Sequence, residues 1–139
     1  LDGDQSLADI DEFCGKIKAG KDVQTDDEFS VVARVEALIA GRGMAEALRR
    51  AEAYRAAGAD GILIHSRMST ADEVLQFANE WAGRAPLVIV PTKYYITPTD
   101  RYREAGISIA RWNVVVCCHS SPTSIGSCHR YRGCFYCND

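Results

Sequence analysis

Short apolar runs alternate with longer segments of helical periodicity along most of this chain, and this alternation restricts the possible folds more than any other feature. The apolar runs are residues 29–35 (FSVVARV), 61–64 (GILI), 87–90 (LVIV) and 107–110 (ISIA). The first of them is apolar nearly throughout, as expected of a parallel strand that is buried on both faces. Strand and helix repeat about every 25 residues, which is typical of a parallel α/β sheet with crossover helices.

The helical segments between these runs carry start signals. The sequence predicts that Ser6 caps the first helix and that Thr70 and Glu73 form a capping box for the third. In the second helix, Glu46 and Arg50 are one turn apart and are expected to pair on the face that meets water. In these three helices the apolar residues recur at helical spacing along one face, as expected of crossover helices beside a parallel sheet.

Two architectures share this alternation: a (β/α)8 TIM-type barrel and a doubly wound open sheet. No GxGxxG motif follows a strand, which removes the main reason to prefer a dinucleotide-binding sheet. The fold class that we predict is therefore α/β, with parallel strands forming a partial (β/α)8 TIM-type barrel. A complete barrel usually needs about 250 residues, whereas this chain has 139.

The charge of the chain excludes some classes of partner. A net charge of −3 gives no electrostatic reason to expect a nucleic acid or an anionic membrane. No segment approaches the roughly 20 apolar residues that cross a bilayer, and the first residues are acidic where a signal peptide is basic. We therefore expect a cytoplasmic protein that binds neither nucleic acid nor membrane.

The pattern changes at the end of the chain, so we divide it into residues 1–112 and an aperiodic tail, residues 113–139. Five of the six cysteines lie in this tail. A structural zinc site normally has two spaced ligand pairs, and the tail offers one CxxC pair without an apolar scaffold, so we assign no metal to it. The sequence favours a shifted reading frame or another artefact as the origin of the tail.

Polar residues at the ends of the predicted strands are the candidate site residues, because active sites of parallel barrels lie at the carboxyl ends of the strands. Arg34 and Glu36 alternate with Val35 and therefore point the same way. The planar fork of an arginine can grip a phosphate or a carboxylate, and the glutamate can orient it or touch a metal-bound water. An internal ion pair without further function remains the alternative.

Two more strand ends carry polar groups. His65 follows the run 61–64 and could donate a hydrogen bond to an anionic oxygen or transfer a proton. Thr92, Lys93 and Tyr94 follow the run 87–90 and offer hydroxyl and ammonium groups. A structural histidine and a solvated lysine are the alternatives, and the residues alone do not decide between them.

Four ordered segments carry a resemblance to a known family. They are LADIDEFCGKIKAGKD, VARVEALIAGRG, RAEAYRAAGADGILIHS and PLVIVPTKYYITPTD. Together they resemble phosphoenolpyruvate mutases, of the isocitrate lyase and phosphoenolpyruvate mutase superfamily. The resemblance covers residues 1–112, ends near Trp112, and implies the later strands and helices of the family's barrel.

The resemblance also implies a function. The family consists of Mg²⁺-dependent isomerases that move a phosphoryl group of phosphoenolpyruvate to carbon, giving phosphonopyruvate for phosphonate biosynthesis. By motif, Arg34 and His65 are the expected catalytic residues that contact the migrating group, and Glu36, Thr92 and Lys93 are further candidates for substrate contact. The family's metal-binding aspartates and closing loop are expected upstream of Leu1, so no metal ligand is assigned here. A homo-oligomer is implied for the complete protein.

Three alternatives stay open. A phosphonopyruvate hydrolase would share the arginine and the histidine, although the segment PTKYYITPT resembles the mutase form. A carbon–carbon lyase of the same superfamily is less similar in its motifs. The third alternative is that the isolated chain is a catalytically inert fragment, because a partial barrel exposes strand edges and apolar surface.

Overall fold

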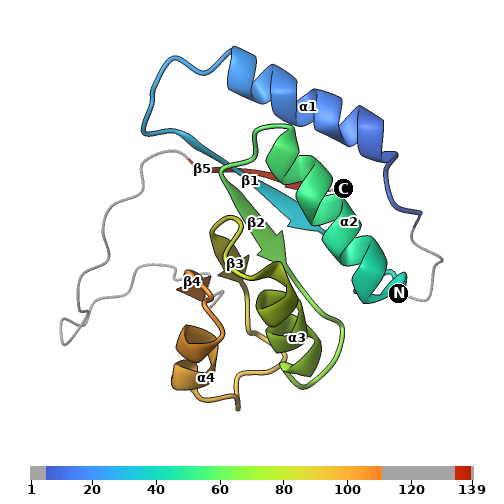
Figure 1. Cartoon of the computed structure of the whole chain (residues 1–139), viewed down its shortest axis with the longest axis vertical. Coiled ribbons are helices and arrows are strands. Elements are labelled where there is room, and N and C mark those ends of the chain that lie inside the picture. The colour runs from blue at the N-terminus through green and yellow to red at the C-terminus, as the bar shows by residue number, and fades with distance from the viewer. Residues whose placement is uncertain (1–5, 111–133, 139) are drawn as a thin grey trace, which may run out of the picture.

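A computed structural model describes residues 6–110 with their side chains and residues 134–138 as backbone. Strands and helices alternate along the chain, as the sequence predicts (Figure 1). The elements are α1 (Ile10–Asp22), β1 (Ser30–Val35), α2 (Gly43–Ala56), β2 (Gly61–Ile64), α3 (Asp72–Trp81), β3 (Leu87–Ile89), α4 (Thr99–Glu104), β4 (Ile109–Ala110) and β5 (Cys134–Asn138).

The strands form one parallel sheet in the order β4-β3-β2-β1-β5. From β1 to β4, each strand pairs with the next one along the chain, and the order never reverses. A doubly wound sheet would reverse its order and carry helices on both faces, whereas this order is that of a barrel wall. The predicted α/β fold with the strand order of a partial barrel is therefore confirmed.

Strand β5 comes from the segment for which the sequence predicts no regular element. Its backbone pairs in parallel with β1, from Ser30 opposite Cys134 to Arg34 opposite Asn138. The strand β1 thus lies between β2 and β5. The rest of the tail, and with it the predicted origin of residues 113–139, lies outside the described residues.

The two faces of the sheet have different cores. One face packs on the helices, with large buried side chains such as Phe13, Tyr54, Phe77 and Trp81. The opposite face carries a second, smaller cluster of Val32, Leu63 and Val88. Side chains alternate along a strand, so Arg34 and Glu36 share the face of Val32. The register pairs Arg34 with Leu63, which places His65 on that same face, beyond the smaller cluster.

The helix caps differ from the predicted ones. Asp9, not Ser6, caps α1, and its Oδ1 accepts hydrogen bonds from the backbone N–H groups of Asp11 (2.9 Å) and Glu12 (3.0 Å). At the start of α3, no side chain caps the backbone. The predicted capping box is therefore wrong: Thr70 donates to Asp72 instead, over 2.8 Å.

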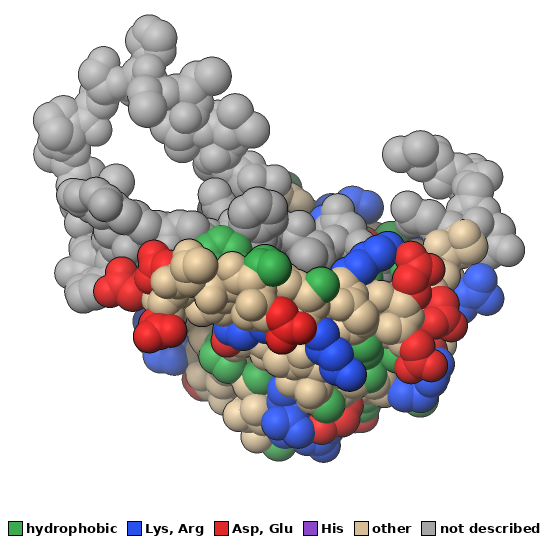
Figure 2. All heavy atoms as spheres, turned by 90° about the horizontal axis from the view of Figure 1, so that it is seen from above, with side chains coloured by type: hydrophobic (Ala, Val, Ile, Leu, Met, Phe, Trp, Pro, Cys, Tyr) green, Lys and Arg blue, Asp and Glu red, His purple; other side chains and the backbone are tan. Residues whose placement is uncertain are grey.

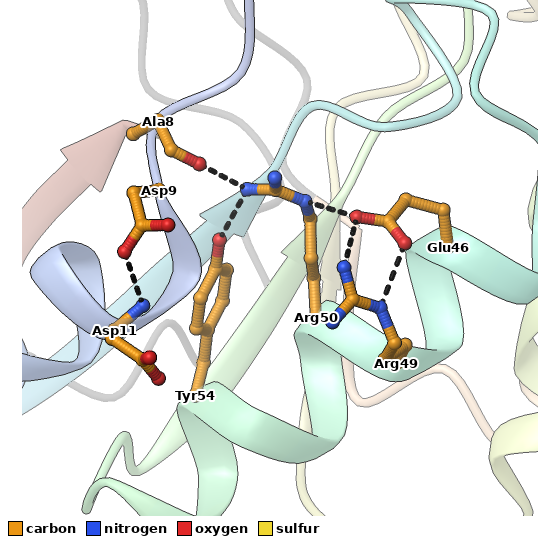
Figure 3. A network of polar contacts seen from close by, with 7 residues as sticks. All are labelled: Ala8, Asp9, Asp11, Glu46, Arg49, Arg50 and Tyr54. Atoms are coloured by element: carbon orange, nitrogen blue, oxygen red, sulfur yellow. Dashed lines mark hydrogen bonds and ion pairs between the residues drawn. The ribbon is translucent and has the colours of Figure 1, made fainter.

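The predicted pair of Glu46 and Arg50 forms, but Arg50 does not face water as expected. Its side chain is only 8% exposed, and its Nε lies 2.9 Å from Glu46 Oε1. Its Nη1 donates to the carbonyl oxygen of Ala8 (2.9 Å) and to the hydroxyl of Tyr54 (3.0 Å), as Figure 3 shows. Arg50 therefore ties α2 to the segment that leads into α1, and these partners offset the cost of burying its charge.

The surface carries both signs of charge. On the face shown in Figure 2, basic and acidic side chains are interspersed rather than gathered into one patch. Several form pairs within one helix, such as Lys16 with Glu12 (2.7 Å) and Arg103 with Asp100 (2.6 Å). Among the described residues, no helix has both the length and the apolar character needed to cross a bilayer.

Candidate active site

Arg34 and Glu36 project from the carboxyl end of β1 and form an ion pair through Arg34 Nε. Their side chains are 31% and 12% exposed, so the arginine remains accessible while the glutamate is mostly covered. A guanidinium has five N–H donors in a fixed plane, and Glu36 is paired by charge with the Nε end of that plane, although Nε forms no hydrogen bond among the described residues. The ion pair compensates the charge of the glutamate, as a purely structural role requires. It also fixes the orientation of the guanidinium, as a role in binding an anion requires.

His65 follows β2 directly and is half-buried. Its Nδ1 lies 3.5 Å from the hydroxyl oxygen of Tyr94, and the centroids of the two rings are 6.1 Å apart. Burial lowers the pKa of His65, and the positive charges of Arg34 and Lys93 lower it further. The two cations therefore lie close enough to act on the imidazole, although they come from different strand ends.

The segment after β3 contributes unequally. Lys93 is exposed and acts on His65 through its charge. Thr92 is also exposed, and its backbone N–H donates to Val90 (2.9 Å). Within the described residues, no hydrogen bond joins the Thr92 side chain to the other candidate residues. The structure thus brings Arg34, Glu36, His65 and Lys93 to one edge of the sheet and leaves Thr92 at its margin.

Ser66 is a residue of this edge that the sequence does not single out. Its side chain is fully buried, its Oγ donates to the carboxylate of Glu73, and it accepts the backbone N–H of Met68 (3.0 Å). These bonds fix the loop that follows His65 against the first turn of α3. A serine after a strand is common in loops, so no sequence signal marks it.

The arrangement suits an anion. Two cations and an imidazole lie near one another at the carboxyl edge, with one carboxylate that is already paired with Arg34. Such groups can hold a phosphate or a carboxylate and stabilise negative charge that develops on it. Across residues 6–110, no three His, Cys, Asp or Glu side chains come together as a metal site would require.

The electrostatics predict how His65 titrates. We expect its pKa below the ordinary value of 6.5, so that it is neutral at pH 7. Because the folded state binds this proton less tightly than the unfolded one, the contribution of His65 to stability is complete above pH 6.5 and decreases as the pH falls through the lowered pKa. Arg34→Gln should raise the pKa in an NMR titration of the ring protons. An unchanged pKa of His65 in this variant would contradict the conclusion that the charge of Arg34 acts on the histidine.

The strand order from β1 to β4 is that of an α/β barrel. An arginine, a histidine and a lysine lie at the carboxyl ends of its strands, where the active sites of barrel enzymes are found. The family model described as phosphoenolpyruvate phosphomutase matches residues 2–117. The chain belongs to this family. The match extends five residues beyond Trp112, where the resemblance of the motifs ends.

Individual relatives agree with the family. The chain is 56% identical over 111 residues to phosphoenolpyruvate phosphomutase of Tetrahymena pyriformis, covering 80% of this chain and 37% of that protein. A solved phosphoenolpyruvate phosphomutase from Streptomyces platensis subsp. rosaceus is 46% identical, with a TM-score of 0.78, and the match covers 81% of this chain and 39% of that one. A phosphonopyruvate hydrolase complex with oxalate and Mg²⁺ is 50% identical, with a TM-score of 0.73, over 79% and 39%.

The chain therefore spans less than two fifths of the length of the relatives that it matches. Their complete barrels contain residues that have no counterpart in the matched segment. Within that segment, the described site residues all lie at the ends of β1, β2 and β3.

Proposed function

We propose that this chain forms part of the barrel of a phosphoenolpyruvate mutase and supplies the residues that hold the migrating phosphoryl group. The observation that carries the proposal is the meeting of Arg34 and His65 at one edge of the sheet, where the charge of the arginine acts on the imidazole. The similarity to named phosphomutases supports the choice of reaction.

The reaction is an isomerisation and needs no co-reactant. The bond between the enol oxygen and phosphorus breaks, and its electron pair forms the carbonyl group at C2. The electron pair of the C2–C3 double bond forms the new bond from C3 to phosphorus. Negative charge spreads over the oxygens of the phosphoryl group during this transfer, so catalysis rests on positioning and on electrostatic stabilisation.

The residues of this chain have distinct tasks in the proposal. Arg34 grips two oxygens of the phosphoryl group through its planar fork, and Glu36 keeps that fork in its orientation. His65 donates a hydrogen bond to a further oxygen, and Lys93 adds positive charge at the rim. The low pKa of His65 favours a neutral donor, which leaves the permanent charge to Arg34.

A metal ion belongs to the complete enzyme in this proposal. The related phosphonopyruvate hydrolase was solved in complex with oxalate and Mg²⁺. In the proposed enzyme such an ion would polarise oxygens of the pyruvyl part of the substrate. The described residues contain no cluster that fits the ion, so we assign none of them to it. We place its ligands in the part of the barrel that the relatives have beyond the matched segment.

The cellular setting is a further part of the proposal. Making a carbon–phosphorus bond is the entry to phosphonate biosynthesis, and we propose this role in the cytoplasm. We further propose that the complete protein forms a homo-oligomer with a small-molecule substrate and no nucleic acid or membrane partner.

A phosphonopyruvate hydrolase is the second candidate, because a solved hydrolase is 50% identical to this chain. In that reaction, water attacks the phosphorus atom and the carbon–phosphorus bond breaks, giving pyruvate and phosphate. Arg34 and His65 could hold the phosphonate in the same way. The segment PTKYYITPT favours the mutase.

The products test whether the residues of this chain support the mutase reaction. We suggest a hybrid enzyme in which the matched part of this chain replaces its counterpart in the Tetrahymena pyriformis relative, which is 56% identical. Incubated with phosphonopyruvate and Mg²⁺, the hybrid should form phosphoenolpyruvate, measured by enzymatic coupling, and little free phosphate. Stoichiometric pyruvate and phosphate without phosphoenolpyruvate would reject the mutase.

A further inference from the structure

Tyr94 places a phenolic hydroxyl beside His65 where water has little access. The tyrosine is 1% exposed, and its hydroxyl oxygen lies 3.5 Å from His65 Nδ1. The two rings are tilted by 41°. A buried tyrosine hydroxyl normally has a hydrogen-bond partner, and within the described part of the chain that partner is the histidine. The separation is long for a hydrogen bond, as is common for catalytic contacts before substrate binds.

Tyr94 is itself held in place. The hydroxyl of Tyr102, a buried residue of α4, donates to the carbonyl oxygen of Tyr94 over 3.1 Å. The backbone N–H of Thr97 donates to the same oxygen, also over 3.1 Å. The tyrosine therefore presents its hydroxyl to His65 from a fixed backbone, and α4 is the element that supports it.

The proton in the contact between the Tyr94 hydroxyl and His65 Nδ1 is expected to stay on the tyrosine. Burial, with a smaller effect of Tyr102, raises the pKa of Tyr94, so the hydroxyl keeps its proton at neutral pH and needs an acceptor. The pKa of His65 is lowered by burial, by Arg34 and by Lys93, which favours the neutral imidazole. A neutral imidazole has one acceptor nitrogen and one N–H. If Nδ1 accepts from the tyrosine, the proton of the ring is on Nε2.

We propose that Tyr94 is a positioning residue that holds His65 in the tautomer with its proton on Nε2, so that the ring offers a directed N–H to an anionic oxygen. The identification of that oxygen as part of a phosphoryl group rests on the proposed function. The tautomer itself depends only on the contact between the two side chains. Tyr94 thereby acts on the reaction through His65 and does not touch the substrate.

The tautomer can be measured in the 139-residue chain without a substrate. With ¹⁵N-labelled histidine, long-range ¹H–¹⁵N correlation at pH 7.5 should show an unprotonated Nδ1 and a protonated Nε2 for His65, assigned with His65→Asn. Tyr94→Phe should shift both nitrogens toward the values of a tautomer mixture. The neighbouring Tyr95 is 65% exposed, so Tyr95→Phe is the matched control and should leave the spectrum unchanged.

A proton on Nδ1 in the unsubstituted chain would overturn the proposal, whether or not Tyr94→Phe folds. So would ring shifts that stay the same in a folded Tyr94→Phe chain. In the hybrid enzyme, Tyr94→Phe should lower kcat roughly tenfold with little change in KM, because the histidine is misplaced rather than removed; an unchanged kcat would overturn the positioning role. A hybrid that makes no phosphoenolpyruvate, together with the expected tautomer, would instead reject the proposed function alone.

Discussion

Arg34→Gln in the hybrid enzyme is expected to lower kcat/KM for phosphonopyruvate by about a thousandfold, because one preorganised donor to a transferring phosphoryl group commonly contributes this much. The substitution removes the charge and the fork that Glu36 orients. Arg34→Lys keeps the charge without the planar fork and should recover only a small part of the rate. Steady-state kinetics measure both variants.

Arg103→Gln is the matched control for this prediction. Arg103 lies in α4, its side chain is 77% exposed, and it pairs with Asp100 on the surface. The control should keep the rate of the unsubstituted hybrid, because surface pairs contribute little. If Arg34→Gln kept more than a tenth of the activity, Arg34 would not hold the reacting group.

Trp81→Ala is expected to lower the free energy of unfolding of the chain by about 3 to 5 kcal/mol, the usual cost of removing a large aromatic side chain from a core. Trp81 is fully buried, its ring stacks on Phe77 with centroids 5.9 Å apart, and its Nε1 donates to Ala85 over 3.0 Å. Urea denaturation followed by circular dichroism measures the change. A variant that shows no cooperative transition at all would have lost the whole free energy of unfolding, which also agrees with the prediction.

Tyr95→Ala removes another large aromatic side chain as the control. Because Tyr95 is 65% exposed, its loss should change the free energy of unfolding by no more than about 0.5 kcal/mol. A cost below about 1 kcal/mol for Trp81→Ala would contradict the packing of α3 against the sheet.

The strands β1 to β3 could be predicted from sequence because buried parallel strands are apolar on both faces, and this pattern is local; β5 (Cys134–Asn138) lies in the tail, where the sequence shows no such pattern. The run 61–64 coincides with β2, and the helix face that includes Val74, Phe77 and Trp81 is buried as its spacing requires. The burial of Arg50 could not be predicted, since it depends on the carbonyl oxygen of Ala8, which is remote in sequence. The prediction of the cap of α1 was wrong because two residues that can cap a helix, Ser6 and Asp9, lie close together in the sequence.

The convergence of the site residues followed from topology. Residues at the carboxyl ends of adjacent parallel strands meet at one edge, so the sequence alone places Arg34, Glu36 and His65 together. The contact of Tyr94 with His65 depends on the path of the loop after β3, and no periodic pattern encodes that path. The burial of Ser66 depends in the same way on its bond to Glu73.

A crystal structure of the hybrid enzyme with phosphonopyruvate and Mg²⁺ would test the central claim most directly. We expect the phosphonate group at the carboxyl edge of β1 and β2, with the Arg34 guanidinium and His65 Nε2 each about 3 Å from one of its oxygens. A phosphonate bound elsewhere, with both side chains turned away from it, would contradict the account.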